Sequence, residues 1–322
     1  MKRREFIAGL SGAAAWPVFA RAQQAARMRR IGVLLFAAED RVAINPFLSG
    51  LEALGYIHGK TVAIAYREVG GNSERAPDLA NELVRLNPDV IFAFGGDLAP
   101  AIKSATATIP IIVLVSNDPV ESGLVASLAR PGGNITGITQ VHDMLAGKSI
   151  ELLKDIVPSV SRVAVLWNPD HADPEFRETQ RGSRTLDVRL QSLEVRGPDD
   201  YDDAFQAAVR ERAQALIVIG ARLQSLNRNR IGDFAEKNRL ILVGVPAWLI
   251  EIGALFTYGP NVPELMKRAA TYVDKILKGA KPSDLPMQQP TTFELHVNLK
   301  AARRLSITVP QTIIARADEV IE

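Results

Sequence analysis

Ten residues suited to recognising a small molecule fall at or just beyond the ends of predicted strands. Carboxylates can hold an ammonium group, a guanidinium can hold a carboxylate, and hydroxyl and amide groups can hydrogen-bond to either. Aromatic rings offer apolar surface, and a glycine lets the backbone approach a ligand closely. The ten candidates are Glu39, Gly96, Asp97, Ser116, Asn117, Asp118, Asn168, Arg222, Trp248 and Tyr258. Their chemistry predicts a noncovalent binding site.

Each candidate also has a structural alternative that the sequence leaves open. Asp118 precedes Pro119, a pattern typical of a helix start, and would then cap a helix over 120–129. Asp97 would similarly cap a helix over 98–107. Asn168 stands before a proline and could form only a turn. Arg222 could be solvated, and the aromatic candidates could belong to the core.

The sequence contains none of the common catalytic patterns. No Gly-x-Gly-x-x-Gly, P-loop or Gly-x-Ser-x-Gly motif follows a predicted strand. The four histidines are scattered, with no pair at helical spacing to hold a metal. The absence of cysteine excludes disulfides, a thiolate nucleophile and a lipid-anchored N-terminal cysteine. We therefore predict no catalytic residue, no metal site and no cofactor.

Short, continuously apolar runs alternate with amphipathic segments along the chain. Such runs indicate strands buried on both faces, as in a parallel sheet covered by helices. The strands are expected at 31–36, 62–66, 90–94, 111–115, 163–167, 188–193, 216–219 and 240–243, and helices between them include 46–54, 74–86, 202–212 and 230–238. This alternation predicts an α/β fold built from right-handed βαβ units.

The two halves of the chain repeat the same order of elements. The runs that begin at Arg30, Pro88 and Thr108 correspond to those that begin at Arg162, Gln214 and Asn238. We therefore predict two Rossmann-like, doubly wound lobes whose strand ends face one cleft; a single large sheet is the alternative. The first lobe is expected over 29–139 and the second over 140–258. Residues 259–322, including a strand over 292–297, would return to the first lobe and complete a hinge of three crossings.

Residues 1–22 have the features of an export signal. A basic start is followed by the apolar run 8–20 and by a small-x-small cleavage pattern that ends at Ala22. The pair Arg3-Arg4 resembles a twin-arginine signal, with ordinary Sec export as the alternative. Removing this segment leaves 34 basic and 35 acidic residues, so charge does not favour nucleic-acid binding. We expect an exported, soluble periplasmic protein without a lipid anchor.

Several stretches resemble the substrate-binding proteins of ABC transporters, in the branch linked to tryptophan and tyrosine uptake. They lie at 116–137, 162–169, 258–260, 270–282, 285–295 and 309–322, and the block from Asp118 to Gly137 is the most specific. The resemblance implies the periplasmic-binding-protein type 1 fold with three crossovers. It also implies a small-molecule ligand, ABC permease and ATPase subunits as partners, and no nucleic acid. We expect a monomer.

The predicted mechanism is hinge closure around a ligand that contacts both lobes. The first lobe would contribute Glu39, Gly96, Asp97 and residues 116–118, and the second Asn168, Arg222, Trp248 and Tyr258. For an amino acid, helix N-termini would hold the carboxylate, and Asp118 or Glu39 the ammonium. Two other functions remain open: a periplasmic sensor that presents its closed form to a receptor kinase or chemoreceptor, and a secreted α/β enzyme.

Overall fold

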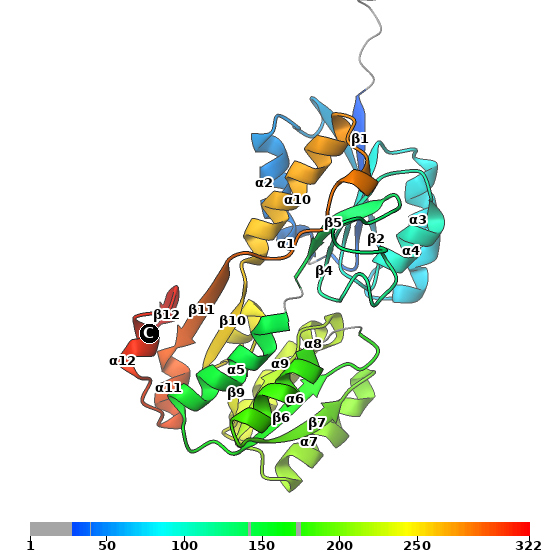
Figure 1. Cartoon of the computed structure of the whole chain (residues 1–322). Helices are drawn as coiled ribbons and strands as arrows, with labels where there is room; N and C mark the ends of the chain where they lie inside the picture. Colours follow the sequence, from blue (N-terminus) through cyan, green and yellow to red (C-terminus); the bar gives the residue numbers. More distant parts are fainter. Residues whose placement is uncertain (1–27, 39, 141–142, 172–174) are drawn as a thin grey trace, which may run out of the picture.

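The computed structural model describes residues 28–38, 40–140, 143–171 and 175–322, and it has two lobes joined by a narrow waist (Figure 1). The predicted export signal and the candidate Glu39 lie outside the described residues. Both lobes are α/β, which confirms the predicted fold class. Among the described residues, no helix has both the length and the apolar character needed to cross a membrane.

The first lobe contains a five-stranded parallel sheet with the order β2-β1-β3-β4-β5. The β1, β3, β4 and β5 strands are largely buried on both faces, as their continuous apolar runs predict, whereas the edge strand β2 is only partly buried. Helices cover one face with α2 and α10 and the other with α3 and α4. The bounds are β1 Arg29–Leu35, α1 Asp40–Ala43, α2 Asn45–Ala53, β2 Val62–Glu68, η1 Ser73–Arg75, α3 Ala76–Arg85, β3 Val90–Phe94, α4 Ala99–Ala105, β4 Ile111–Val115 and β5 Ile135–Thr139.

The second lobe contains a seven-stranded sheet with the order β12-β11-β10-β9-β8-β6-β7. The β6, β7, β8, β9 and β10 strands pair in parallel, and β11 runs antiparallel to β10. The bounds are α5 Asp143–Ile156, β6 Arg162–Trp167, α6 Glu175–Thr185, β7 Arg189–Glu194, η2 Pro198–Asp200, α7 Tyr201–Arg210, β8 Ala215–Val218, α8 Arg222–Leu226, α9 Arg228–Lys237, β9 Ile241–Gly244, η3 Ala247–Ile250, β10 Phe256–Pro260, β11 Phe293–Asn298, α11 Leu299–Leu305, α12 Gln311–Ile314 and β12 Glu319–Ile321.

The chain passes between the lobes three times (Figure 1). The first passage joins β5 to α5, and the second joins β10 to α10 (Val262–Leu277). Helix α10 packs closely on α2, because Gly50 has no side chain: a Cβ there would lie 2.9 Å from the Cβ of Ala270. After η4 (Pro282–Asp284), Gln288 forms a bridge with β5 before the third passage leads to β11.

The predicted return of 259–322 to the first lobe needs a correction. Residues 262–288 do pack on the first lobe, but β11 and β12 belong to the second sheet. The strand expected at 292–297 pairs with β10 and covers an edge that would otherwise expose unpaired backbone groups. The half-exposed burial pattern of β11 fits this outer position.

Candidate functional site

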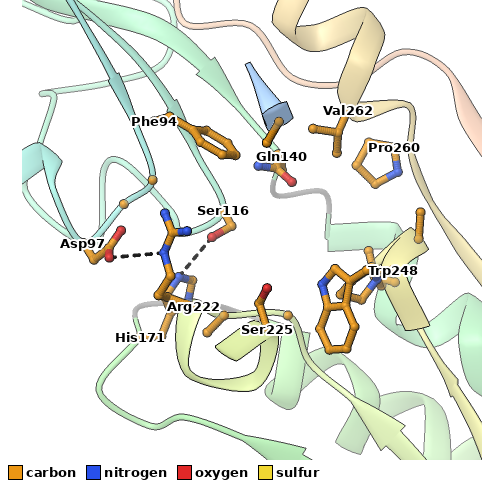
Figure 2. Close-up of a pocket in the computed structure, with 18 of the residues that line it drawn as sticks. Phe94, Asp97, Ser116, Gln140, His171, Arg222, Ser225, Trp248, Pro260 and Val262 are labelled. Carbon is orange, nitrogen blue, oxygen red and sulfur yellow. Dashed lines mark hydrogen bonds and ion pairs between the residues drawn. The ribbon is translucent and has the colours of Figure 1, made fainter. Parts of the chain in front are cut away.

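A cavity of about 420 Å³ lies between the two lobes (Figure 2). The first lobe lines it with residues that follow β3, β4 and β5, and the second lobe with residues that follow β6, β8, β9 and β10. These are the carboxyl ends of the strands in both sheets, the edge at which open α/β sheets bind ligands. The volume falls in the range of small-molecule sites.

Arg222 reaches from the second lobe into a charged cluster on the first. It begins α8 directly after β8, and its Nη1 lies 2.9 Å from Oδ1 of Asp40 while its Nε lies 3.5 Å from Oδ2 of Asp97. The second oxygen of Asp40 accepts the backbone N–H groups of Phe36 at 2.9 Å and Ala37 at 3.3 Å. Asp40 therefore joins a first-lobe turn to a second-lobe cation.

Aromatic rings and a glycine complete the surroundings of this guanidinium. Its carbon lies 4.7 Å from the ring centre of Phe36 and 5.8 Å from that of Phe94, within cation–π range. Gly95 has φ +111°, and a Cβ there would lie 2.5 Å from Asp97 Oδ1 and 2.9 Å from Arg222 Nη2. Only glycine combines this backbone conformation with this close approach. Burial raises the pKa of Asp97, and the charge of Arg222 opposes that rise.

A second contact between the lobes joins Ser116, which follows β4, to His171, which follows β6. The Oγ and Nε2 atoms lie 3.2 Å apart (Figure 2). Burial lowers the pKa of His171 to about 4, because the imidazolium form would lose its hydration. His171 is therefore neutral at pH 7 and contributes a hydrogen bond rather than a charge.

The opposite side of the cavity is mostly apolar. Trp248, in η3, faces the space across from Arg222 and Asp97, and Pro260 and Val262 lie near it (Figure 2). Ser225 and Gln140 add hydrogen-bonding groups to the wall. The site thus has a charged end and an apolar end, an arrangement that suits a small amphipathic molecule.

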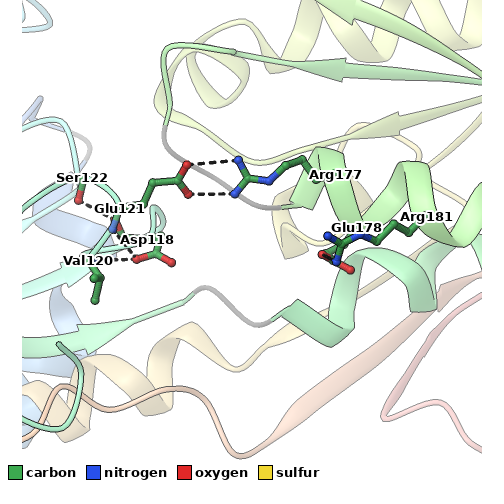
Figure 3. Close-up of polar contacts among 7 residues, drawn as sticks. All are labelled: Asp118, Val120, Glu121, Ser122, Arg177, Glu178 and Arg181. Carbon is green, nitrogen blue, oxygen red and sulfur yellow. Dashed lines mark hydrogen bonds and ion pairs between the residues drawn. The ribbon is translucent and has the colours of Figure 1, made fainter.

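A charged pair closes the rim of the cleft (Figure 3). Arg177, on α6 of the second lobe, donates to both carboxylate oxygens of Glu121 on the first lobe, at 3.2 and 3.0 Å. The hydrogen bonds to Glu121 raise the pKa of Arg177, and the negative charge of Glu121 adds a smaller rise in the same direction. Both side chains are about half exposed, so water and salt screen this contact.

The helix expected over 120–129 is wrong: a turn spans 119–123, and irregular backbone with bends follows it over 124–129. Gly123 adopts φ +69°, a left-handed conformation that interrupts a helix, and Pro131 follows soon after. Asp118 nevertheless caps the first turn: its Oδ1 accepts the N–H groups of Val120 at 2.7 Å and Glu121 at 3.0 Å. This capped turn presents Glu121 to Arg177 (Figure 3).

Nine of the ten predicted residues lie in the described part of the chain, which excludes Glu39, and these nine form two groups. Five of them line the cavity: Gly96, Asp97, Ser116, Arg222 and Trp248. Four others lie away from its wall: Asn117, Asp118, Asn168 and Tyr258. Ligand contact by any of them stays a prediction.

The positions of the second group have local reasons. The side chain of Asn117 is buried over Gly96, where a Cβ would lie 2.2 Å from its Oδ1. Asn168 accepts the N–H of Asp170 at 2.9 Å, which is the turn role left open by the sequence. Tyr258 packs on the core of the second lobe, with its ring centre 6.1 Å from that of Phe293. These side chains support the walls instead of forming their inner surface.

Sequence reasoning missed Asp40, Phe94, Gln140 and His171, which also line the cavity. Three of them could have been found from the same strand-end rule, since Asp40 follows β1, Gln140 follows β5 and His171 follows β6. Phe94 ends an apolar run and has no sequence signal that separates it from core residues. Within the described residues, no group of three or more His, Cys, Asp or Glu side chains could hold a metal ion.

Comparison with known proteins gives one family. A profile described as ABC transporter substrate binding protein matches residues 31–321. A tyrosine-binding protein from Clostridioides difficile (strain R20291) is 24% identical over 278 residues, which cover 85% of this chain and 80% of the relative.

Solved structures show the same two-lobed fold. A conserved domain protein from Vibrio cholerae matches with a TM-score of 0.85 and 27% identity, over 91% of this chain and 100% of that one. A Streptococcus pneumoniae protein in complex with L-Trp matches with a TM-score of 0.84 and 22% identity, over 91% and 99%. A ligand-free, open substrate-binding protein from Clostridium difficile matches with a TM-score of 0.70 and 22% identity, over 91% and 99%.

Proposed function

Because the chain belongs to the ABC transporter substrate binding protein family, we propose that it binds a small solute in the cavity between its lobes and delivers it to an ABC permease and ATPase in the membrane. The family is one of solute-binding proteins and not of enzymes. The observation that carries the proposal is the cavity itself. Both sheets direct their carboxyl strand ends into it, and three crossings let the lobes move relative to each other.

The proposed ligand is an amino acid with an aromatic or apolar side chain. A relative named a tyrosine-binding protein and a structural neighbour that holds L-Trp support this ligand class. The site has matching chemistry: carboxylates and a guanidinium at one end for a zwitterionic head group, and Trp248 at the other for an apolar side chain.

Closure of the lobes around the ligand is the proposed mechanism. The described structure has contacts across the cleft, namely those of Arg222 with Asp40 and Asp97, and that of Ser116 with His171. The TM-score to the L-Trp complex exceeds that to the open, ligand-free protein, which supports a closed arrangement of the lobes. A ligand that touches both lobes would shift an open–closed equilibrium toward closure.

A ligand screen tests this proposal. Each of the amino acids is added to the protein, the melting temperature is measured, and hits are titrated by calorimetry. A ligand at 100 times its Kd adds about 2.7 kcal/mol to the free energy of unfolding, so a true ligand gives a clear shift. Mass spectrometry of the recovered ligand must show an unchanged compound. A screen without an amino-acid hit would overturn the ligand class, and a converted compound would overturn the binding function.

The periplasmic location is part of the proposal and rests on the predicted export signal at 1–22. N-terminal sequencing of the exported protein should begin at residue 23. Replacing Arg3 and Arg4 together by lysine should retain the protein in the cytoplasm if export uses the twin-arginine route. Unimpeded export of that variant would favour the Sec route. Light scattering should give the mass of a monomer.

A further inference from the structure

The guanidinium of Arg222 occupies a niche that belongs entirely to the first lobe. Two carboxylates, two aromatic rings and one glycine surround it, and all five residues lie at the ends of β1 and β3 or in the turns that follow them. The occupant comes from the other lobe, 182 residues away from Asp40 in the sequence. The niche and its occupant must therefore separate whenever the lobes open.

The niche does not need Arg222 to keep its shape. Asp40 is held by two backbone N–H groups of its own lobe, those of Phe36 and Ala37. Phe94 ends a strand of the central sheet, and the φ of Gly95 fixes the path of the backbone beside it. Opening would leave a preformed pocket with two carboxylates and no counter-charge from Arg222.

The chemistry of the niche selects a planar or compact cation. Asp40 supplies a charge-assisted hydrogen bond at 2.9 Å, Asp97 adds an ion pair at 3.5 Å, and the two ring faces attract a cation through their quadrupoles. An anion in the niche would be repelled by both carboxylates. An apolar group there would leave the carboxylates buried without hydrogen-bond partners.

We propose that Asp40, Asp97, Phe36, Phe94 and Gly95 form a cation-binding subsite for a guanidinium or primary ammonium group, and that Arg222 is its intramolecular occupant when the lobes are closed. A solute with such a group enters the subsite by displacing Arg222. Arg222 is then a specificity-determining residue, because every cationic solute competes with it and neutral or anionic solutes do not. The subsite rests on contacts of the described residues and holds whether or not the transported solute is an amino acid.

Removal of the occupant tests the subsite with a simple probe. In Arg222→Ala, the lobes should open, and the radius of gyration measured by small-angle X-ray scattering should rise. Methylguanidinium chloride at about 20 mM should bind the vacated subsite and raise the melting temperature of this variant, while NaCl at the same concentration, which screens charge equally, should not. The native protein should need a higher concentration of methylguanidinium for the same shift, because Arg222 competes for the subsite.

Two further variants keep the test sharp. Arg228→Ala removes another arginine that lines the cavity and should respond to methylguanidinium no more than the native protein does. Adding Asp97→Asn to Arg222→Ala should raise the half-saturating concentration of methylguanidinium by roughly tenfold, because one of the two carboxylates that hold the cation loses its charge. If Arg222→Ala does not fold, Arg222→Gln, which keeps most of the side-chain length, takes its place. Equal responses to methylguanidinium and NaCl, or a response of the Arg228 variant as strong as that of Arg222→Ala, would overturn the proposal.

Discussion

Breaking the ion pair at the rim should weaken ligand binding without changing the cavity. Arg177 and Glu121 belong to different lobes, so their bidentate contact exists only in the closed form. Their side chains are 58% and 44% exposed, and such pairs contribute about 0.5 kcal/mol. If the ligand binds the closed form, Arg177→Ala lowers the closed population by that free energy and raises Kd about twofold.

The assay is isothermal titration of the ligand found in the screen, repeated with Glu121→Ala and with the double variant. Because the two residues act through one contact, the double variant should show about the same twofold effect as each single variant. Raising the ionic strength from about 0.1 to 1 M should remove most of the difference between native protein and variants, since the Debye length falls from about 10 to 3 Å.

Arg181 provides the matched control on the same helix. Its partner, Glu178, lies three residues away on α6, with 2.6 Å between the charged atoms, so this pair is present whether the lobes are open or closed (Figure 3). Arg181→Ala should leave Kd unchanged. If Arg177→Ala and Arg181→Ala give the same Kd, the rim pair does not contribute to closure and the reasoning fails.

Three more predictions follow from single side chains. Asp118→Ala removes the cap of two backbone N–H groups and should cost about 1 kcal/mol, seen as a fall in melting temperature of about 2–4 °C; an unchanged melting temperature would contradict the capping role. Trp248→Ala should weaken binding of an aromatic ligand by at least roughly tenfold in calorimetry, whereas Trp167→Phe, which keeps the stacking on α6, should not. Ligand affinity should fall as pH drops from about 6.5 to 4. In the open form His171 takes up a proton in this range, whereas burial in the closed form lowers its pKa, so protonation favours opening. Asp97, with its raised pKa, acts in the opposite direction, so His171→Gln should abolish the fall in affinity and leave only the opposite dependence that Asp97 gives.

Local sequence patterns predicted the architecture. The four apolar runs of the first half all became parallel strands, and three of them, β1, β3 and β4, are buried because a run without polar alternation packs between two helical layers. The strand-end rule then placed Asp97, Ser116 and Arg222 beside the cavity. These outcomes follow from local periodicity and from the direction of parallel strands, which are properties of neighbouring residues in the chain.

Which side chains meet depends on tertiary packing. Asp40 and Arg222 are far apart in the sequence, and nothing in either segment indicates that a first-lobe carboxylate takes a second-lobe cation. The sequence of β11 also does not show which sheet it joins, because its pairing with β10 on one side and β12 on the other depends on neighbours outside its own segment. The polar residue at a strand end lines the cavity or supports its wall according to how the two lobes pack, as Asp97 and Asn117 show. Hydrophobic periodicity predicts which face of an element is buried and where the element ends. Contacts between the lobes depend on how the lobes pack together, which no local sequence pattern encodes.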